Sequence, residues 1–278
     1  MGQTHRVTGA NDVGLSVYEC GNPDGQAILL IHGLFQCCLS WNYQFDSALA
    51  DEFRIVAMDL RGHGMTDKPT DTESYTIGQY WADDVASVID QLELKKPVLA
   101  GWSYGGLVIG DYLQCYGDGK IGGINFAGAA ATLGTEEAKT LIGPKVMELI
   151  PGFMSEDLSE SIAATRDFVI LCSAEPPSDK DRELALAYNM MVPLQVRRDA
   201  FSREVHFGEV LKSVTVPTLV TQGTEDQMAT PPMAKIFLNS IPHAVESVYE
   251  GVGHAPFMED AERFNRELGE LARSVANS

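Results

Sequence analysis

The sequence is short of basic residues. It has 20 Lys and Arg against 39 Asp and Glu in 278 residues, which gives a formal net charge of −19 at pH 7. Nucleic acids and anionic membranes attract proteins with basic surfaces, so we expect neither of them as a partner. The simplest interpretation of the excess of acidic residues is a solvated acidic surface, and this excess does not indicate which substrate the protein binds.

Cysteine is scarce as well. The five cysteines are irregularly spaced, odd in number and without a C-x-x-C pair; they are Cys20, Cys37, Cys38, Cys115 and Cys172. This pattern argues against a disulfide framework or a zinc site. Reduced thiols favour a cytoplasmic location. The adjacent Cys37 and Cys38 are interpreted as packing residues, with redox sensitivity as the alternative.

Long hydrophobic runs are also missing. No apolar stretch approaches the roughly 20 residues that span a bilayer. Residues 1–11 lack the apolar core of a signal peptide and are expected to form a ragged terminus. A membrane-spanning or secreted protein is therefore not expected.

Short apolar runs alternate with stretches of helical periodicity along most of the chain. Helices are expected at 83–92 and 259–275, where apolar residues recur every three or four positions. The expected strands cover residues 27–31, 54–58, 97–100, 121–127, 218–221 and 246–249. This alternation predicts an α/β fold with a mostly parallel sheet flanked by helices.

One long segment interrupts the alternation. Residues 129–210 contain no convincing strand, and helices are expected over 136–150, 156–171, 179–189 and 194–203. The strand pattern resumes near residue 218. We therefore predict a core domain made of residues 1–128 and 211–278, with a helical cap at 129–210.

The most informative motif surrounds Ser103. The run Gly101-Trp102-Ser103-Tyr104-Gly105 follows an apolar strand and precedes a helical stretch. A serine on a sharp turn between strand and helix exposes its hydroxyl at the edge of the sheet, and the flanking glycines avoid clashes. Ser103 is the candidate nucleophile.

A serine hydroxyl needs a base, and the base needs an orienting carboxylate. Of six histidines, His254 is preferred because its loop follows the last strand and emerges where Ser103 emerges. Asp226 and Glu225 both follow the strand at 218–221, and Asp226 is preferred from its spacing after Gly223. The chain order is serine, acid, histidine.

The oxyanion that develops during acyl transfer needs two N–H donors. The backbone N–H groups of Tyr104 and Leu34 are the candidates, because one follows the nucleophile and the other follows His32-Gly33 after a strand. His32 and the turn at 59–64, which includes His63, are expected to be structural.

A pocket for the substrate is expected to be apolar. The candidate lining residues are Phe35, Trp102, Phe153, Met190 and Met191. Most apolar residues of a cap simply pack between helices and sheet, so packing is the alternative for each of them.

Together these motifs resemble the α/β-hydrolase superfamily over nearly the whole chain. The matching pieces are His32-Gly33, the 59–64 turn, Gly101–Gly105, Gly223–Asp226 and Gly253-His254. Within that superfamily the chain is similar to small esterases, cofactor-free haloperoxidases (perhydrolases) and acyl-homoserine lactonases. The resemblance implies an α/β-hydrolase fold with an inserted cap.

We predict a serine hydrolase that cleaves a small apolar ester or lactone through an acyl-enzyme, without a metal or organic cofactor. Alternatives with the same triad are a carbon–carbon bond hydrolase and a perhydrolase. A non-catalytic ligand receptor on this fold is a third alternative. The oligomeric state and the natural substrate stay open.

Overall fold

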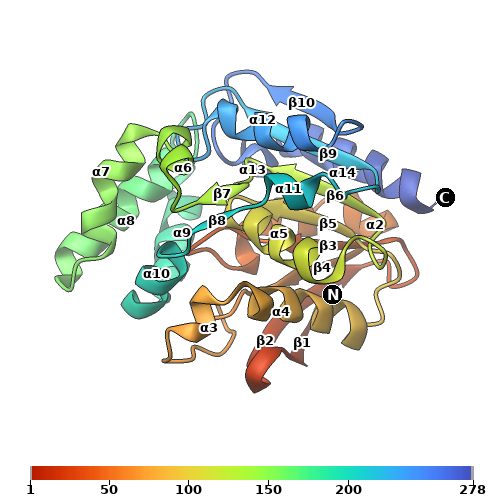
Figure 1. Cartoon of the computed structure of the whole chain (residues 1–278), viewed down its shortest axis with the longest axis horizontal. Coiled ribbons are helices and arrows are strands. Elements are labelled where there is room, and N and C mark those ends of the chain that lie inside the picture. The colour runs from red at the N-terminus through yellow and green to blue at the C-terminus, as the bar shows by residue number, and fades with distance from the viewer. Residues whose placement is uncertain (1, 277–278) are drawn as a thin grey trace.

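The computed structural model describes residues 2–276 and is built around one eight-stranded sheet (Figure 1). Its strands are β1 (Gln3–Thr8), β2 (Gly14–Gly21), β3 (Ala27–Ile31), β4 (Arg54–Met58), β5 (Val98–Trp102), β6 (Gly123–Ala127), β9 (Thr218–Gly223) and β10 (Val245–Tyr249). Their order across the sheet is β1-β2-β4-β3-β5-β6-β9-β10. The first two strands are antiparallel to their neighbours, and β4 to β10 are parallel. The predicted fold class is confirmed.

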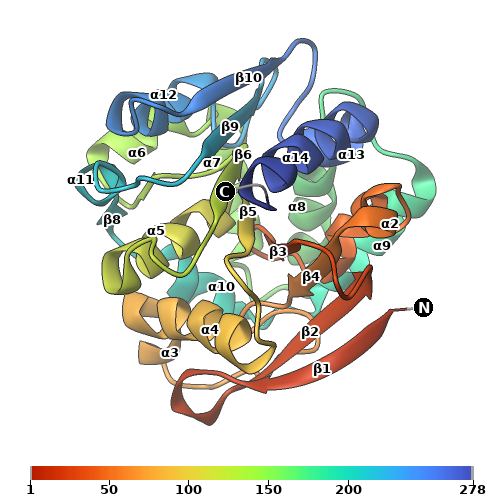
Figure 2. The same ribbon diagram turned by 90° about the vertical axis from the view of Figure 1, so that its right-hand side faces the viewer.

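Helices cover both faces of the sheet. The helices are α1 (Asn42–Phe45), α2 (Leu49–Glu52), α3 (Glu73–Thr76), α4 (Gly78–Gln91), α5 (Tyr104–Tyr116), α6 (Glu136–Leu141), α7 (Pro144–Phe153), α8 (Leu158–Leu171), α9 (Asp179–Met190), α10 (Leu194–Phe201), α11 (Gly208–Leu211), α12 (Pro231–Ser240), α13 (Pro256–Glu259) and α14 (Ala261–Ala276), with short 3-10 turns η1 (Ala10–Asp12) and η2 (Cys38–Trp41). Figure 2 shows α4, α5 and α12 on one side of the sheet and α2 and α14 on the other. A side chain on either face of a central strand is therefore buried.

The central strands were predictable because their composition reflects this double burial. All five residues of β3 are buried, as are all five of β5 and β6. A strand covered on both faces is apolar at every position rather than at alternate ones. The expected strands all correspond to observed ones, with ends that differ by up to two residues.

The prediction for the N-terminus was wrong. Residues 3–8 form the edge strand β1, which pairs with β2 in an antiparallel hairpin. His5 lies in this strand, and its Nε2 atom is 2.8 Å from a carboxylate oxygen of Glu19. Because the outer strand is largely exposed, it lacks the apolar run by which the inner strands were recognised.

Helices α6 to α10 gather at one end of the sheet, at the left of Figure 1. The single helix expected over 136–150 is two helices, because the backbone at Gly143 donates its N–H to Gln227 O at 3.0 Å and Ile142 pairs with Ala229. Pro144 then starts α7. The segment also contains two-residue strands, β7 (Thr132–Leu133) and β8 (Val205–His206), which pair with each other and were not expected.

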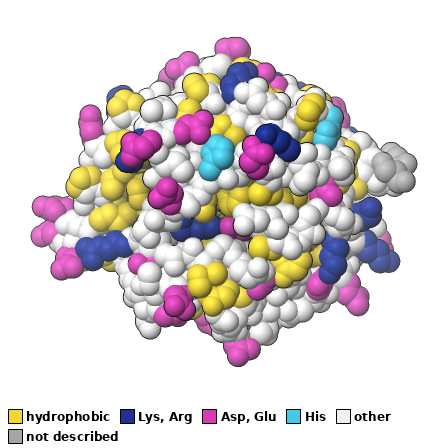
Figure 3. Space-filling view, viewed as in Figure 1, with side chains coloured by type: hydrophobic (Ala, Val, Ile, Leu, Met, Phe, Trp, Pro, Cys, Tyr) yellow, Lys and Arg dark blue, Asp and Glu magenta, His cyan; other side chains and the backbone are white. Residues whose placement is uncertain are grey.

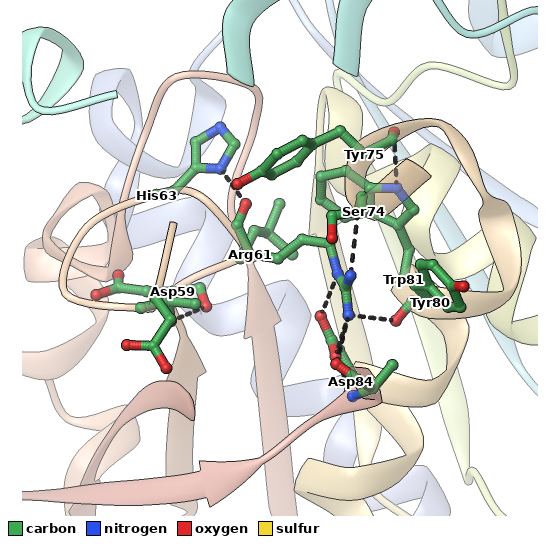
Figure 4. A network of polar contacts seen from close by, with 12 residues as sticks. Asp59, Arg61, His63, Ser74, Tyr75, Tyr80, Trp81 and Asp84 are labelled. Atoms are coloured by element: carbon green, nitrogen blue, oxygen red, sulfur yellow. Dashed lines mark hydrogen bonds and ion pairs between the residues drawn. The ribbon is translucent and has the colours of Figure 1, made fainter. Parts of the chain in front are cut away.

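A buried ion pair braces the turn after β4 (Figure 4). Arg61 donates from Nε and Nη2 to the two carboxylate oxygens of Asp84, at 2.8 Å each. It also donates to the carbonyl oxygens of Ser74 and Tyr80. Burial raises the pKa of Asp84. This network ties the turn to α4, as expected for a structural role of residues 59–64.

Acidic side chains are spread over the face drawn in Figure 3 rather than gathered in one patch. Hydrophobic side chains are also visible there, over the region of α7. Within residues 2–276, no helix combines the length and apolar character needed to cross a bilayer.

Candidate active site

Ser103 lies between the end of β5 and the start of α5, at the carboxyl edge of the sheet. Its backbone has φ 54° and ψ −116°, a conformation that residues other than glycine rarely adopt. Such a residue costs about 1–3 kcal/mol and persists only where the surroundings enforce it. A Cβ atom on Gly105 would lie 2.4 Å from Ile31 O, so the close packing of α5 against β3 requires glycine there.

His254 and Asp226 form a buried hydrogen-bonded pair. The two loops that follow β9 and β10 bring His254 Nδ1 within 2.8 Å of Asp226 Oδ2. The two residues are 2% and 1% exposed, so this pair is shielded from competing water. Glu225, the alternative acid, is exposed to solvent.

Asp226 accepts three further hydrogen bonds. Its Oδ1 receives the backbone N–H groups of Met228 at 2.7 Å and Ala229 at 3.0 Å. Its Oδ2 accepts a hydrogen bond from Gln222 Nε2 at 3.1 Å. Four donors around one carboxylate satisfy its oxygens and hold it in one orientation. Gln222 was missed from the sequence, because only the fold shows that the side chain of Gln222, near the end of β9, reaches the acid.

Gly128 completes the surroundings of this pair. It lies in the loop after β6 with φ 48°, and a Cβ atom there would stand 3.2 Å from both Asp226 Oδ2 and His254 Nδ1. The same Cβ would be 2.9 Å from His254 O. A larger residue would therefore displace the histidine or the acid.

Ser103 and His254 line the same cavity. It holds about 760 Å³ of empty space, counting the part at its mouth that is open to solvent. Its lining is largely apolar and comes from the core, from α7 and α8, and from the loop after β9. The apolar lining residues include Leu34, Phe35, Ile150, Phe153, Met154, Phe168, Met228 and Met233. The described lining residues include neither lysine nor arginine.

Three aromatic rings form one wall of the cavity. The ring centroids of Phe153 and Phe168 are 5.0 Å apart and perpendicular, and Phe35 lies 5.7 Å and 5.9 Å from them. Phe35 and Phe153 thus line the cavity, as predicted from the sequence. Met154 and Phe168, two further apolar residues of the cap segment, also line the cavity, and Met228 and Met233 are lining residues that the sequence did not indicate.

The two candidate oxyanion donors border the cavity. Tyr104 is the first residue of α5, where N–H groups have no acceptor within the helix. The loop of Leu34 passes beside the nucleophile, since a Cβ on Gly33 would lie 3.0 Å from Ser103 Cβ. Phe35 in the same loop has φ 68°, which marks a tight turn. These positions are compatible with the predicted donor role.

Three predicted pocket residues lie elsewhere. Trp102 points away from the cavity: its indole N–H donates to His254 O at 2.8 Å, and its ring contacts Phe257. Met191 is 47% exposed, and the sulfur of Met190 lies 3.6 Å from Arg197 Nη2. Neither methionine is among the residues that line the cavity with Ser103.

His32 and His63 are structural, as expected. His32 Nε2 accepts the N–H of Leu60 at 3.0 Å, and Nδ1 donates to Gly33 O at 2.7 Å. Burial lowers the pKa of His32 to about 4 and that of His63 to about 3, with the His32 charge adding to the second effect. Both are therefore neutral at pH 7, and His32 fixes the loop that carries Leu34.

The chain resembles known proteins over nearly its whole length. The family model described as the alpha/beta hydrolase family matches residues 28–267, so the chain belongs to that family. The chain is similar to a non-heme chloroperoxidase from Streptomyces lividans, at 26% identity over 290 residues, covering 96% of this chain and 99% of the relative.

Two solved structures are similar over nearly their whole length. A putative aryl esterase from Burkholderia cenocepacia has a TM-score of 0.91 and 32% identity, covering 99% of this chain and 100% of the other. An esterase from Rhodococcus has a TM-score of 0.91 and 32% identity, covering 98% and 99%. The chain is a hydrolase of this superfamily, related to esterases and haloperoxidases.

Proposed function

We propose that this protein is a serine hydrolase that cleaves a small apolar carboxylic ester through Ser103, His254 and Asp226. The observation that carries the proposal is the strained Ser103 backbone at the edge of a cavity that His254 also lines, with His254 Nδ1 bonded to Asp226. No other hydroxyl in the described structure combines that conformation with a buried histidine–carboxylate pair in the same cavity.

In the proposed reaction His254 Nε2 takes the Ser103 proton as Oγ attacks the ester carbonyl carbon. Asp226 keeps the proton on Nδ1 and stabilises the imidazolium that forms. The N–H groups of Leu34 and Tyr104 donate to the oxyanion. The imidazolium then protonates the leaving alcohol, and water repeats the sequence on the acyl-enzyme to release the acid.

The cavity lining supports an uncharged substrate. Apart from Ser103, His254 and Thr132, almost all of the lining side chains are apolar, so a charged group would enter without a partner. A neutral ester or lactone with a short apolar acyl chain fits this chemistry. Membranes and nucleic acids are not proposed as partners, since the net charge is −19.

A perhydrolase is the second candidate, favoured by the similarity to the Streptomyces lividans chloroperoxidase. In that reaction hydrogen peroxide replaces water in attacking the same acyl-enzyme, which releases a peroxy acid and the free Ser103 hydroxyl. The candidate thus shares every residue role with the esterase and differs only in the second nucleophile.

The test is hydrolysis of p-nitrophenyl esters of increasing acyl length beside acyl-homoserine lactones, with wild type and Ser103→Ala. We expect turnover of the wild type, highest for short apolar acyl groups, and loss of turnover in Ser103→Ala. The exposed Ser213→Ala is the matched control. Turnover retained by Ser103→Ala contradicts the proposal. Ligand binding without wild-type turnover points instead to a receptor.

A further inference from the structure

Glu259 lies at the end of α13, five residues after His254, and its carboxylate contacts the histidine loop. Its Oε1 accepts the N–H of Gly253 at 3.0 Å and that of Ala255 at 3.3 Å. Its Oε2 is 3.1 Å from the same Gly253 nitrogen and accepts the N–H of Ala174 at 2.7 Å. One carboxylate thus binds the peptide groups on both sides of His254.

Ala174 belongs to the segment between α8 and α9, so Glu259 also joins the histidine loop to that segment. The contact is close, since a Cβ on Gly253 would lie 2.5 Å from the Ala174 nitrogen. The N–H of His254 itself donates to Cys172 O at 3.0 Å in the same segment. The loop of the base is therefore docked on the chain that follows α8.

Apart from the contacts with Glu259, the described hydrogen bonds that hold the backbone on either side of His254 come from neutral groups. The carbonyl of His254 accepts Trp102 Nε1, and its ring is bonded to Asp226. Hydrogen bonds to an ionised acceptor are roughly twice as strong as those between neutral groups. Catalytic side chains must be held to within about 0.5 Å of their working geometry. Glu259 adds carboxylate hydrogen bonds on both sides of His254 to the neutral ones made with Cys172 and Trp102.

We propose that Glu259 is a positioning residue that fixes His254 by holding the peptide groups at 253 and 255 and tying them to Ala174. The proposal rests on the serine hydrolase function above and adds a residue to it. Glu259 acts through the backbone, so its loss lowers the rate of proton transfer and leaves substrate binding in the apolar cavity unchanged.

The test is Glu259→Gln, which keeps the shape but replaces one of two acceptor oxygens by an NH₂ group that faces an N–H donor. We expect kcat on a short p-nitrophenyl ester to fall about 10- to 100-fold, as for a displacement of the base by up to about 1 Å. The KM should change less than about threefold. The rate constant for reaction of Ser103 with a phosphonate, which also needs the base, should fall by the same factor as kcat, with complete labelling in the end.

Glu262→Gln is the matched control, because this carboxylate lies three residues further on and is exposed. In this variant Ser103 should react with the phosphonate at the wild-type rate. If wild type itself does not react at Ser103, the proposed function fails. If wild type reacts and Glu259→Gln reacts at the same rate, only the positioning role fails.

A purely structural role has a different signature. It predicts a lower melting temperature and a smaller labelled fraction at an unchanged rate constant, and that result overturns the proposal. Should Glu259→Gln not fold, Glu259→Asp replaces it, since it keeps both oxygens on a side chain one methylene shorter. We expect the folded Asp variant to label several-fold more slowly than wild type, and the wild-type rate again overturns the proposal.

Discussion

Replacing Asp226 with Asn tests the orientation of the base. The carboxylate accepts His254 Nδ1 and Gln222 Nε2 on Oδ2, and the backbone N–H groups of Met228 and Ala229 on Oδ1. An amide has one acceptor and one donor end, so either placement sets its NH₂ against donors. The two backbone N–H groups cannot change, whereas the imidazole can move its proton to Nε2. We therefore expect the introduced amide to turn its NH₂ toward His254.

In that tautomer Nε2 carries a proton and cannot accept one from Ser103. A triad with the wrong tautomer loses about 10⁴ in kcat, equivalent to about 5 kcal/mol of barrier. The NH₂ group also faces the Gln222 amide, and an unsatisfied buried group of this kind costs about 1–3 kcal/mol of stability. The measurements are kcat and KM on a p-nitrophenyl ester and the free energy of unfolding in urea.

Glu225→Gln is the matched control, since Glu225 is the adjacent carboxylate and is exposed. It should retain wild-type activity within about twofold, as expected for a surface change. If Asp226→Asn keeps more than a tenth of the wild-type kcat, the assignment of the acid is wrong. If Glu225→Gln loses as much activity as Asp226→Asn, the neighbouring carboxylate has been misassigned.

Three further predictions concern specificity and stability. Phe153→Ala removes a ring of the cavity wall, so kcat/KM for an octanoyl ester relative to an acetyl ester should rise about 10-fold; an unchanged ratio would remove Phe153 from the substrate site. Asp84→Ala leaves the buried Arg61 cation unpaired and should lower the free energy of unfolding in urea by about 3–5 kcal/mol, and a loss below about 1 kcal/mol would contradict this. Because the pKa values of buried His32 and His63 lie at about 4 and about 3, below the unfolded value near 6.5, their neutral forms favour folding above pH 6.5. That stability is lost as the pH falls from 6.5 toward 4, by about 3 kcal/mol for each at pH 4. In urea titrations at pH 7 and pH 4, His63→Gln should lose less stability than wild type over this range, and an equal loss would refute the assignment.

The residues of the candidate triad could be found from the sequence because their signals are local. Ser103 stands between an apolar strand and a helix, and Gly101 and Gly105 flank it within five residues. Asp226 and His254 each follow a strand whose carboxyl end faces the same edge of the sheet. Each of these residues lies in or next to a short motif of adjacent residues that predicts its strand and loop. Because the strands are parallel, their carboxyl ends lie at one edge of the sheet, and the three residues are expected to meet there.

The pocket was predicted less well, because its lining depends on how distant elements pack. Met228 and Met233 come from the loop after β9 and from α12, and no local pattern marks them as neighbours. Met190 and Met191 looked suitable by composition, but the direction in which α9 faces is set by its packing against α8. Trp102 is adjacent to the nucleophile in sequence, and yet its side chain bonds to the backbone of His254 and does not line the cavity.

The edge of the sheet was also missed for a physical reason. β1 is mostly exposed and pairs through its backbone, so its stability comes from hydrogen bonds with β2 that leave no apolar signature. The two-residue strands β7 and β8 are shorter than any periodicity can reveal. The extent of the predicted cap at 129–210 stays a prediction, although α6 to α10 all fall within it.

The central claim is that Ser103 is an activated nucleophile, and the mass of the protein after treatment with a serine-reactive phosphonate tests it most directly. We predict one adduct for each chain, located by peptide mapping at Ser103, with ester turnover lost in proportion to labelling. Turnover that persists in fully treated protein, or an adduct that maps to another residue, would contradict the account.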